Sequence, residues 1–408
     1  MKLPTGYTYA AIYAGIRKKE KDDLALIVST PPAVAAAMFT RNMVQAAPVR
    51  LACKNLASSK GRVAAVMINA GNANCATRTG ARVALLTTRA AAKALGCRAD
   101  HVLPCSTGVI GVELDSNLLT NSLTPLVAKL SPDAFEDVAN AIMTTDTRQK
   151  IASEEVPCEG GVVQVVGMTK GSGMIQPNMA TMLAFVMTDA VVKADDLDGM
   201  LESAVERSFH SLTVDGETST NDTTLLLANG ASGVRPRGRE RDALADAVAR
   251  VMESLARQIA ADGEGARKLI VIRAAGFRNR KEAARIARAV ANSPLVKTAT
   301  GGSDANWGRI LCAAGYALIS PPGQPINDVP EIIPERTSVS FVPTDGSAEL
   351  KLLVNGEPEN VDEKRASEIL EMEDLEILVR LGTGDKSIVH WTCDFSHDYV
   401  TINGDYRT

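Results

Sequence analysis

Apolar residues along the chain follow two patterns, which together predict a mixture of buried strands and amphipathic helices. Short, nearly continuous apolar runs that are rich in β-branched residues are typical of buried strands. Such runs cover Leu24–Val28, Ala33–Phe39, Val63–Ile68, Val162–Met168, Met182–Met187, Leu225–Ala228 and Leu269–Ile272. Helical spacing or composition predicts helices over Arg82–Leu95, Ala134–Met143, Leu197–Val205, Leu244–Ile259 and Lys281–Ala291. We therefore expect an α/β protein.

The boundaries of several elements carry signals of their own. Gly96 is expected to end the first helix, and Ser131-Pro132-Asp133 reads as a helix start with an N-cap and a first-turn proline and carboxylate. From Thr337 to Ile402 the pattern predicts mostly short alternating strands, with Asn355-Gly356 as a hairpin turn. The elements do not alternate in the strict rhythm of a doubly wound sheet. This order favours a layered α/β sandwich.

Length and composition favour a globular protein with two lobes. A chain of 408 residues exceeds what one hydrophobic core usually serves, and its 45% hydrophobic and 23% charged residues are ordinary for a folded protein. The formal net charge of -4 provides no large field for attracting nucleic acid or an anionic membrane. No apolar run reaches roughly 20 residues, the length of a membrane span. We therefore expect neither nucleic acid nor a membrane as a partner.

The cysteines and the N-terminus bear on the compartment. Seven cysteines are present, and no two have C-x-x-C spacing, which favours reduced thiols and argues against a zinc site or any other metal. The N-terminus lacks the apolar core of a signal peptide, so the chain is predicted to be cytoplasmic. The scattered histidines, among them His390 and His397 in a segment with strand character, are weak candidates for catalysis.

Polar loops follow several of the apolar runs. Thr40-Arg41-Asn42 is either a ligand clamp or a strand end, and the asparagines of Asn69–Asn74 suit a tight turn as well as a polar ligand. Ser106-Thr107-Gly108 is either a structural turn or one that aims a hydroxyl and a backbone N–H at an oxyanion. Thr144–Arg148 and Val214–Thr223 are further loops rich in hydroxyl groups. For the first and third of these loops alone, the structural interpretation is favoured.

The stretch Lys170–Ala190 joins an unusual loop to a buried strand. The loop contains Gly171, Gly173 and Pro177, which set backbone shapes that other residues resist, and Thr181 lies where the loop meets the apolar run. A hydroxyl at this border is expected in a chain that cuts itself to expose an N-terminal threonine. On this stretch alone, a purely structural hydroxyl is an equal alternative.

Six motifs taken together resemble the ornithine acetyltransferase family, the glutamate N-acetyltransferases of the cyclic arginine-biosynthesis pathway. They are Phe39–Asn42, Asn69–Asn74, Ser106–Gly111, Met143–Thr147, Lys170–Leu183 and Asn306–Arg309. The motifs occur in the family's order, span nearly the whole chain and are jointly specific. Glu217, where the family usually has Asp, and Ala305, where it often has Pro, depart from the pattern. Neither departure touches the expected nucleophile.

This resemblance implies a self-cleavage between Ala180 and Thr181, which yields an α chain of residues 1–180 and a β chain of residues 181–408. It further implies the family's layered α/β sandwich, with two intimately packed lobes, and a heterotetramer of two α and two β chains. Thr181 would be the nucleophile, and its freed α-amine, with an ordinary pKa of about 7.7–8.0, can act as the general base.

The resemblance also implies the remaining site residues. Thr107 and Gly108 would form the oxyanion hole, which stabilises the tetrahedral intermediate. The residues that would line the substrate site are Thr147, Lys170, Thr181, Glu264, Asn403 and Thr408.

The predicted reaction is acetyl transfer from N2-acetylornithine to L-glutamate through an acetyl-Thr181 intermediate, without a cofactor. Acetyl-CoA as a further donor stays open. The nearest alternative is a self-processing aminopeptidase or amidase, because the same nucleophile could pass its acyl group to water. A phosphate- or nucleotide-binding module at Lys170-Gly171-Ser172-Gly173 is disfavoured, since these glycines lead into a strand rather than a helix N-terminus. An inactive structural homologue would show neither cleavage nor activity.

Overall fold

The computed structural model describes residues 1–176, 182–317 and 333–405, and it divides the chain into two compact units. The first unit contains Met1–His210 and Glu217–Ile259, and the second contains Ser211–Gly216 and the chain from Ala260 onward. The first unit therefore includes residues from both sides of the predicted cut. The division into residues 1–180 and 181–408 concerns the covalent chain rather than these units, and it stays a prediction.

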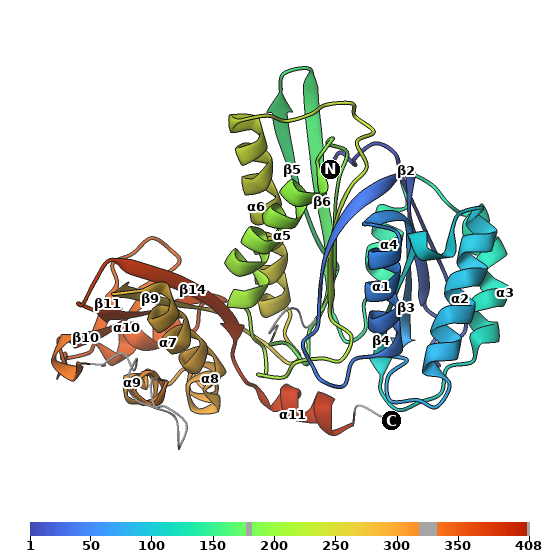
Figure 1. Ribbon diagram of the computed structural model, residues 1–408. Coiled ribbons are helices and arrows are strands. Elements are labelled where there is room, and N and C mark those ends of the chain that lie inside the picture. The colour runs from blue at the N-terminus through green and yellow to red at the C-terminus, as the bar shows by residue number, and fades with distance from the viewer. Residues whose placement is uncertain (177–181, 318–332, 406–408) are drawn as a thin grey trace. The chain divides into compact units, whose positions relative to one another are not determined.

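The first unit is built on an eight-stranded sheet (Figure 1). Its strands are β1 (Tyr7–Ile12), β2 (Leu24–Phe39), β3 (Arg62–Asn72), β4 (Val102–Val109), β5 (Lys150–Cys158), β6 (Gly161–Lys170), β7 (Leu183–Thr188) and β8 (Thr223–Ala228). Seven of them follow the order β4-β3-β2-β8-β7-β6-β5, and β1 pairs with β2. Thus β7 and β8, which follow the predicted cut, lie between β2 and β6, which precede it. Both are buried at every residue, as expected for continuous apolar runs in a covered sheet.

Helices cover both faces of this sheet. They are α1 (Ala47–Ser58), α2 (Gly80–Leu95), α3 (Ser116–Ala128), α4 (Phe135–Ala141), α5 (Ala194–Arg207) and α6 (Arg239–Ala261). On β6, a Cβ at Gly167 would lie 2.9 Å from the side chains of Val251 and Leu255 on α6. The adjacent Val166 and Met168 belong to a core cluster that includes α4. The sheet is therefore a middle layer, with α5 and α6 on one side and α1 and α4 on the other (Figure 1).

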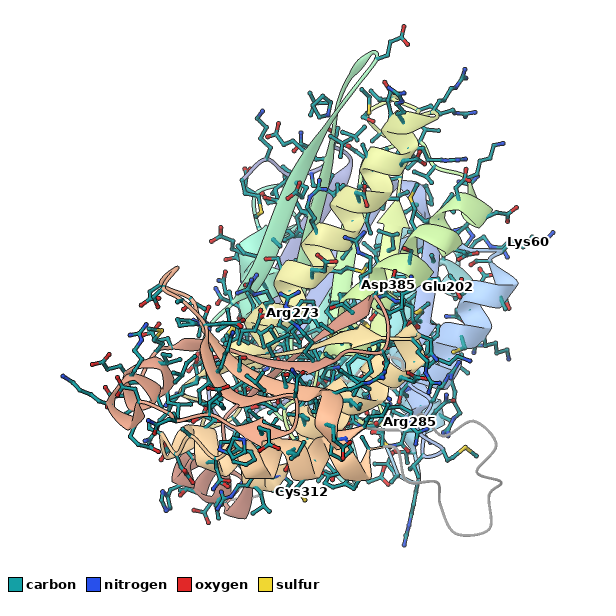
Figure 2. The ribbon with its side chains drawn as sticks, turned by 90° about the vertical axis from the view of Figure 1, so that its left-hand side faces the viewer. Lys60, Glu202, Arg273, Arg285, Cys312 and Asp385 are labelled. Carbon is teal, nitrogen blue, oxygen red and sulfur yellow. The ribbon has the colours of Figure 1, made fainter. Side chains whose placement is uncertain are left out.

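The second unit contains a six-stranded sheet in the order β12-β11-β10-β13-β9-β14. Its strands are β9 (Leu269–Phe277), β10 (Thr337–Pro343), β11 (Leu350–Val354), β12 (Glu357–Pro358), β13 (Asp374–Leu381) and β14 (Lys386–Cys393). Its helices are α7 (Arg280–Asn292), α8 (Pro294–Gly301), α9 (Trp307–Tyr316), α10 (Glu363–Leu370) and α11 (His397–Gly404). Residues of α7, α9 and α10 share one core cluster with β9, β10 and β13. Arg273 on β9 forms an ion pair with Glu376 on β13 at 2.6 Å, and Figure 2 marks its position on the sheet.

The mixed α/β architecture and most of the predicted elements are confirmed. Gly96 ends α2 in the left-handed conformation, with φ of 67°. Asn355 and Gly356, with φ of 50° and 82°, form the turn between β11 and β12. All seven cysteines are free thiols, in agreement with the prediction that they are reduced. Within the described parts of the chain, no helix has the length and apolar character needed to cross a membrane.

Three element predictions need correction. Ser131 does not start a helix, because its backbone forms a bridge with Tyr9 of β1, and α4 begins only at Phe135. The last predicted strand is wrong, because the chain forms helix α11 there, capped by the Ser396 side chain. The predicted elements also lack helices α1, α3, α8, α9 and α10.

Candidate active site

The loop of residues 217–222 ties together several of the sequence motifs in the first unit. The hydroxyl of Thr40 donates to the carbonyl of Ser219 at 2.7 Å, and the side-chain amide of Asn42 donates to the carbonyl of Thr218 at 2.8 Å. Both side chains therefore serve to hold a neighbouring loop. Of the two interpretations of this motif, the strand end is the one that the structure supports.

Asn221 extends this network to the asparagine motif and to the candidate oxyanion turn. Its side-chain amide donates to the carbonyl of Ala73 at 2.7 Å and to the carbonyl of Ser106 at 2.9 Å. On the other side of the loop, the backbone N–H of Gln176 donates to the carbonyl of Glu217 at 2.7 Å. Motifs that are far apart in sequence thus meet at one end of the sheet.

Thr107 and Gly108 end strand β4 beside the end of the parallel strand β3. Thr107 pairs with Ala70, and Gly108 pairs with Gly71. Gly108 has φ of 130°, and a Cβ at this position would collide with the backbone of Gly71. Only glycine allows this approach, which fixes where the Gly108 N–H and the Thr107 hydroxyl are presented.

Lys170, the last residue of β6, contacts this turn. Its Nζ donates a hydrogen bond to Thr107 Oγ1 at 3.3 Å. Because an ammonium group has donors only, Thr107 Oγ1 must accept, and the hydroxyl hydrogen of Thr107 remains for another acceptor. Lys170 is 8% exposed, so its charge acts with little screening by water. The pair can therefore present a hydroxyl donor beside a positive charge, which suits a developing oxyanion.

This contact requires a strongly curled sheet. β4 and β6 lie five positions apart in the strand order, which in a flat sheet would separate them by roughly 24 Å. β2 provides the change of direction, because its pairing with β3 shifts register between Val28 and Ala33, and residues 34–39 pair with β8 on the other edge.

A buried carboxylate lies directly behind Lys170. Asp146 Oδ1 accepts from Lys150 Nζ at 2.6 Å and from the backbone N–H of Gly171 at 2.7 Å, and the side chains of Asp146 and Lys150 are fully buried. Burial alone would raise the pKa of Asp146. The charges of Lys170 and Lys150 and the hydrogen bonds from Lys150 and Gly171 outweigh burial and hold this pKa well below its ordinary value. A lowered pKa favours the ionised form of Asp146.

Asp146 and Lys150 were not among the predicted site residues. Asp146 lies in the hydroxyl-rich loop before β5, where the exposed Thr147 follows it. The available signal was an aspartate followed four residues later by a lysine at the start of a strand, which on the surface would be an ordinary ion pair. The pairing of β5 with β6, in which Lys150 lies opposite Thr169, brings the ion pair next to Lys170.

In the second unit, two more predicted residues meet. The side-chain amide of Asn403 on α11 donates to Glu264 Oε2 at 2.9 Å and to the carbonyl of Tyr399 at 3.0 Å. Glu264 is 5% exposed, so it is a buried acid whose position is set by this amide. The chain segment before α11 holds the Glu264 loop a second time, because the hydroxyl of Ser396 donates to the carbonyl of Gly265 at 2.6 Å.

Three of the other residues noted in the sequence, Asn306, Trp307 and His390, lie in structural positions. Asn306 caps α9 by accepting from the N–H of Arg309, and Trp307 packs against the core of the second unit. His390 is buried in β14, where burial and the nearby charge of Arg288 lower its pKa to about 3.

The predicted nucleophile cannot be placed by these contacts. Ala180, Thr181 and Thr408 lie outside the described residues. The structure brings together Thr107, Gly108 and Lys170 in the first unit, and Glu264 and Asn403 in the second. The assignments of these residues to catalysis and substrate binding stay predictions.

Comparison with known proteins finds relatives that share 34% to 52% of their residues with this chain. The arginine biosynthesis bifunctional protein ArgJ, mitochondrial, of Fusarium vanettenii is 52% identical over 99% of this chain and 92% of its own length. The crystal structure of ArgJ from Bacillus halodurans is 37% identical and covers 55% of this chain and 100% of its own, with a TM-score of 0.49. That of Mycobacterium tuberculosis ornithine acetyltransferase complexed with ornithine is 34% identical and covers 43% of this chain and 94% of its own, with a TM-score of 0.39.

The prediction of a cytoplasmic location is wrong by this comparison. The relative from Fusarium vanettenii and those from three further fungi are named as mitochondrial proteins. The sequence argument failed because it asked only for the apolar core of a secretory signal. Mitochondrial transit peptides are amphipathic and have no such core.

The family comparison covers almost the whole molecule. The family model that matches is described as the ArgJ family, and the match extends over residues 8–408. It includes the turn at Thr107, Lys170, the predicted cut and the Glu264–Asn403 pair. The resemblance predicted from the six motifs is thereby confirmed, and the chain belongs to the ArgJ family.

Proposed function

We propose that this protein transfers an acetyl group from N2-acetylornithine to L-glutamate through an acetyl ester on Thr181, as a step of arginine biosynthesis. Membership of the ArgJ family bears out the prediction of an acyltransferase of arginine biosynthesis over that of an aminopeptidase or amidase. The geometric observation that carries the proposal is the contact of Lys170 with Thr107 beside Gly108, because it places a hydroxyl, a backbone N–H and a positive charge at one point.

The enzyme first cuts itself. Thr181 Oγ attacks the carbonyl of Ala180, the amide nitrogen leaves as the α-amine of Thr181, and the acyl group moves from N to O. Water then hydrolyses the ester, which leaves a carboxylate on Ala180 and a free hydroxyl on Thr181. The products are chains of residues 1–180 and 181–408.

Acetyl transfer uses the same hydroxyl with a new base. The α-amine of Thr181 takes the hydroxyl proton as Oγ attacks the acetyl carbonyl, and Thr107 and Gly108 donate to the oxyanion. The intermediate collapses, and the departing α-amine of ornithine takes the proton back. Glutamate then attacks the acetyl ester through its neutral α-amine and gives its proton to the α-amine of Thr181. Collapse of the second intermediate returns that proton to Thr181 Oγ and releases N-acetylglutamate.

Charged residues suit the two substrates. Lys170 can hold a substrate α-carboxylate, and Glu264, held by Asn403, can face the cationic amine of ornithine. Thr147 and the terminal residue Thr408 complete the proposed substrate site. No cofactor is needed, since nucleophile, base and oxyanion donors all come from the chain.

The proposal is tested by intact mass and by product analysis. Wild type is expected as two fragments that meet at residues 180 and 181, and Thr181→Ala as one uncut chain of 43.1 kDa without acetyl transfer. With N2-acetylornithine and glutamate, wild type should form ornithine and N-acetylglutamate in ping-pong fashion. A wild type that stays uncut, or one that releases acetate in place of N-acetylglutamate, contradicts the proposal.

Two finer points belong to the same proposal. The word "bifunctional" in the name of the Fusarium vanettenii relative supports a second activity here, for which acetyl-CoA is the donor and glutamate the acceptor. We also infer a heterotetramer of two α and two β chains, for which native mass should be twice 43.1 kDa. Formation of N-acetylglutamate from acetyl-CoA checks the first point, and native mass spectrometry checks the second.

A further inference from the structure

Asp146 collects donors from three separate places. Its Oδ1 accepts from Lys150 Nζ at 2.6 Å and from the N–H of Gly171 at 2.7 Å, and its Oδ2 accepts from the N–H of Thr144 at 2.9 Å. The carboxylate thus binds the start of β5, the end of β6 and the loop between α4 and β5.

Gly171 is the donor that links this carboxylate to the active site. It directly follows Lys170, whose Nζ contacts Thr107, and it is the first residue of the loop that leads to Ala180 and Thr181. A hydrogen bond to the Gly171 N–H therefore sets the direction in which the loop leaves β6. It also limits the movement of the Lys170 backbone.

The charges of two lysines act on Asp146. Lys150 forms an ion pair with Asp146 at 2.6 Å, and both side chains are fully buried. The charge of Lys170, whose Nζ contacts Thr107, also acts on Asp146. If Asp146 lost its charge, two buried ammonium groups would repel each other, and Lys170 would be displaced from Thr107.

Stability alone is a poor explanation for this pair. The desolvation of two buried charges offsets most of their attraction, and well-packed apolar residues often serve as well. Asp146 also accepts a hydrogen bond from Gly171, the first residue of the loop that leads to Thr181. Fixing the position of Gly171 is therefore a clearer use for the buried pair than stability.

We propose that the buried Asp146–Lys150 pair is a positioning element of the active site, which anchors Gly171 for self-cleavage and keeps Lys170 against Thr107 for acetyl transfer. The inference deepens the function proposed above and rests on it. In this role Asp146 and Lys150 act through Gly171 and Lys170.

Asp146→Asn tests the role in cleavage, and Asp189→Asn is the matched control. Asp189 is also a buried aspartate of the same sheet, and it accepts from the N–H groups of Thr5 and Gln164 at 3.0 Å each. It follows β7 at the end of that strand away from the cut. The appearance of the two fragments is followed by intact mass. We expect cleavage to slow by about tenfold or more in Asp146→Asn, the factor for one weakened charge-assisted hydrogen bond, and to keep its wild-type rate in Asp189→Asn.

A kinetic measurement separates positioning from folding. On the cleaved fraction, kcat for acetyl transfer should fall about tenfold in Asp146→Asn, because Lys170 no longer holds Thr107. Asp146→Glu, which keeps the charge, should recover part of the cleavage rate and of kcat. The double variant Asp146→Asn, Lys150→Met removes the unpaired buried lysine, so it keeps the test available should the single variant fold poorly. It should still cleave slowly, since the carboxylate is absent.

The outcomes separate this inference from the proposed function. Normal cleavage and normal kcat in Asp146→Asn or in the double variant, with an active wild type, overturn the positioning role alone. Equal slowing in Asp146→Asn and Asp189→Asn also overturns it, because the effect then belongs to the stability of the sheet. A wild type that neither cleaves nor transfers acetyl groups removes the proposed function and this inference together.

Discussion

Lys170 limits the hydrogen bonds that the hydroxyl of Thr107 can form. Lys170 donates to its oxygen, which leaves the hydroxyl hydrogen directed elsewhere. The glycine that follows provides a backbone N–H in a conformation closed to other residues. At the residue scale, the candidate oxyanion hole thus depends on the contact between the side chains of Lys170 and Thr107 and on the backbone conformation of Gly108.

Removing this hydroxyl should damage turnover more than binding. In Thr107→Val, we expect kcat of the cleaved enzyme to fall by about 10²–10³, with a small change in KM, as for the loss of one oxyanion donor. Steady-state kinetics check this expectation. Thr107→Ser should restore much of the rate. Thr87→Val is the control, because the Thr87 hydroxyl is buried and bonded to the carbonyl of Val83 within α2. An unchanged kcat in Thr107→Val removes Thr107 from the mechanism.

His390 should make the protein sensitive to acid. Its pKa is lowered from 6.5 to about 3 in the folded state, so the unfolded chain binds the proton first as pH falls. The stability due to the neutral imidazole is therefore present above pH 6.5 and is lost between pH 6.5 and pH 3. From pH 7 to pH 5 this loss is about 2 kcal/mol. Denaturant unfolding at pH 7 and pH 5 measures this loss. Between these two pH values, the free energy of unfolding of His390→Leu should fall by about 2 kcal/mol less than that of wild type. His101→Gln, a change at a partly exposed site, should keep the wild-type pH dependence.

At the scale of elements, helix α11 holds Glu264, the acid proposed to face the amine of ornithine. Ser396 caps it by accepting from the N–H of Asp398 at 3.1 Å, and the same hydroxyl holds the carbonyl of Gly265. The helix in turn presents Asn403 to Glu264. Ser396, the loop of Glu264 and Gly265, and helix α11 are therefore held together by these hydrogen bonds.

Ser396→Ala should weaken the attachment of helix α11 to the loop of Glu264 and Gly265. The loss of an N-cap costs about 1 kcal/mol, which corresponds to a rise of roughly 5-fold in KM for N2-acetylornithine if Glu264 holds the ornithine amine. The value of kcat should change little, since the oxyanion donors are untouched. Asp362→Ala, which removes the cap of α10, gives a similar loss of stability as a control. Equal KM values in the two variants contradict a role for α11 in substrate binding.

The same elements show how far the sequence could lead. Strands such as β7 and β8 were predictable because they are buried on both faces and must be apolar throughout. Helix α11 was mistaken for a strand because it has no buried residue, and so no helical spacing of apolar positions could mark it. Ser131 has the residue type of an N-cap, but its pairing with Tyr9 is tertiary and prevails over the local signal.

The site was predictable to a similar degree. Thr107, Gly108 and Lys170 were named through the resemblance to the ornithine acetyltransferase family, because the Ser106-Thr107-Gly108 turn by itself favours a structural interpretation. The pairing of Asp146 with Lys150 escaped because its position beside Lys170 depends on the pairing of β5 with β6, in which Lys150 lies opposite Thr169. The local sequence around Asp146 does not show which strand β5 pairs with.

At the scale of the whole molecule, the strand order makes the two predicted chains depend on each other. β8 pairs with β2, and β7 pairs with β6, so the second chain contributes the two central strands and the first chain the strands on both sides. Neither product has a complete sheet in the first unit.

Separate production of the two chains should therefore fail. When residues 1–180 and 181–408 are made as two polypeptides in one cell, we expect mostly insoluble material and little transferase activity. The physical reason is that each chain exposes apolar strand edges until it meets the other. The yield of soluble, active complex is compared with that of the self-cleaved wild type. High activity from separately made chains contradicts the idea that the sheet forms before the cut.

The insertion of β7 and β8 between strands of the other chain also sets the lifetime of each molecule. While the chain is intact, a molecule that unfolds can return, because the connection from β6 to β7 keeps the missing strands at hand. After the proposed cut that connection would be gone, and an unfolded molecule would become two incomplete pieces that must find each other in dilute solution. Its persistence would then be governed by how slowly it unfolds rather than by its free energy of folding. The proposed cleavage would activate the protein and, in the same step, leave it unable to refold readily once it has unfolded.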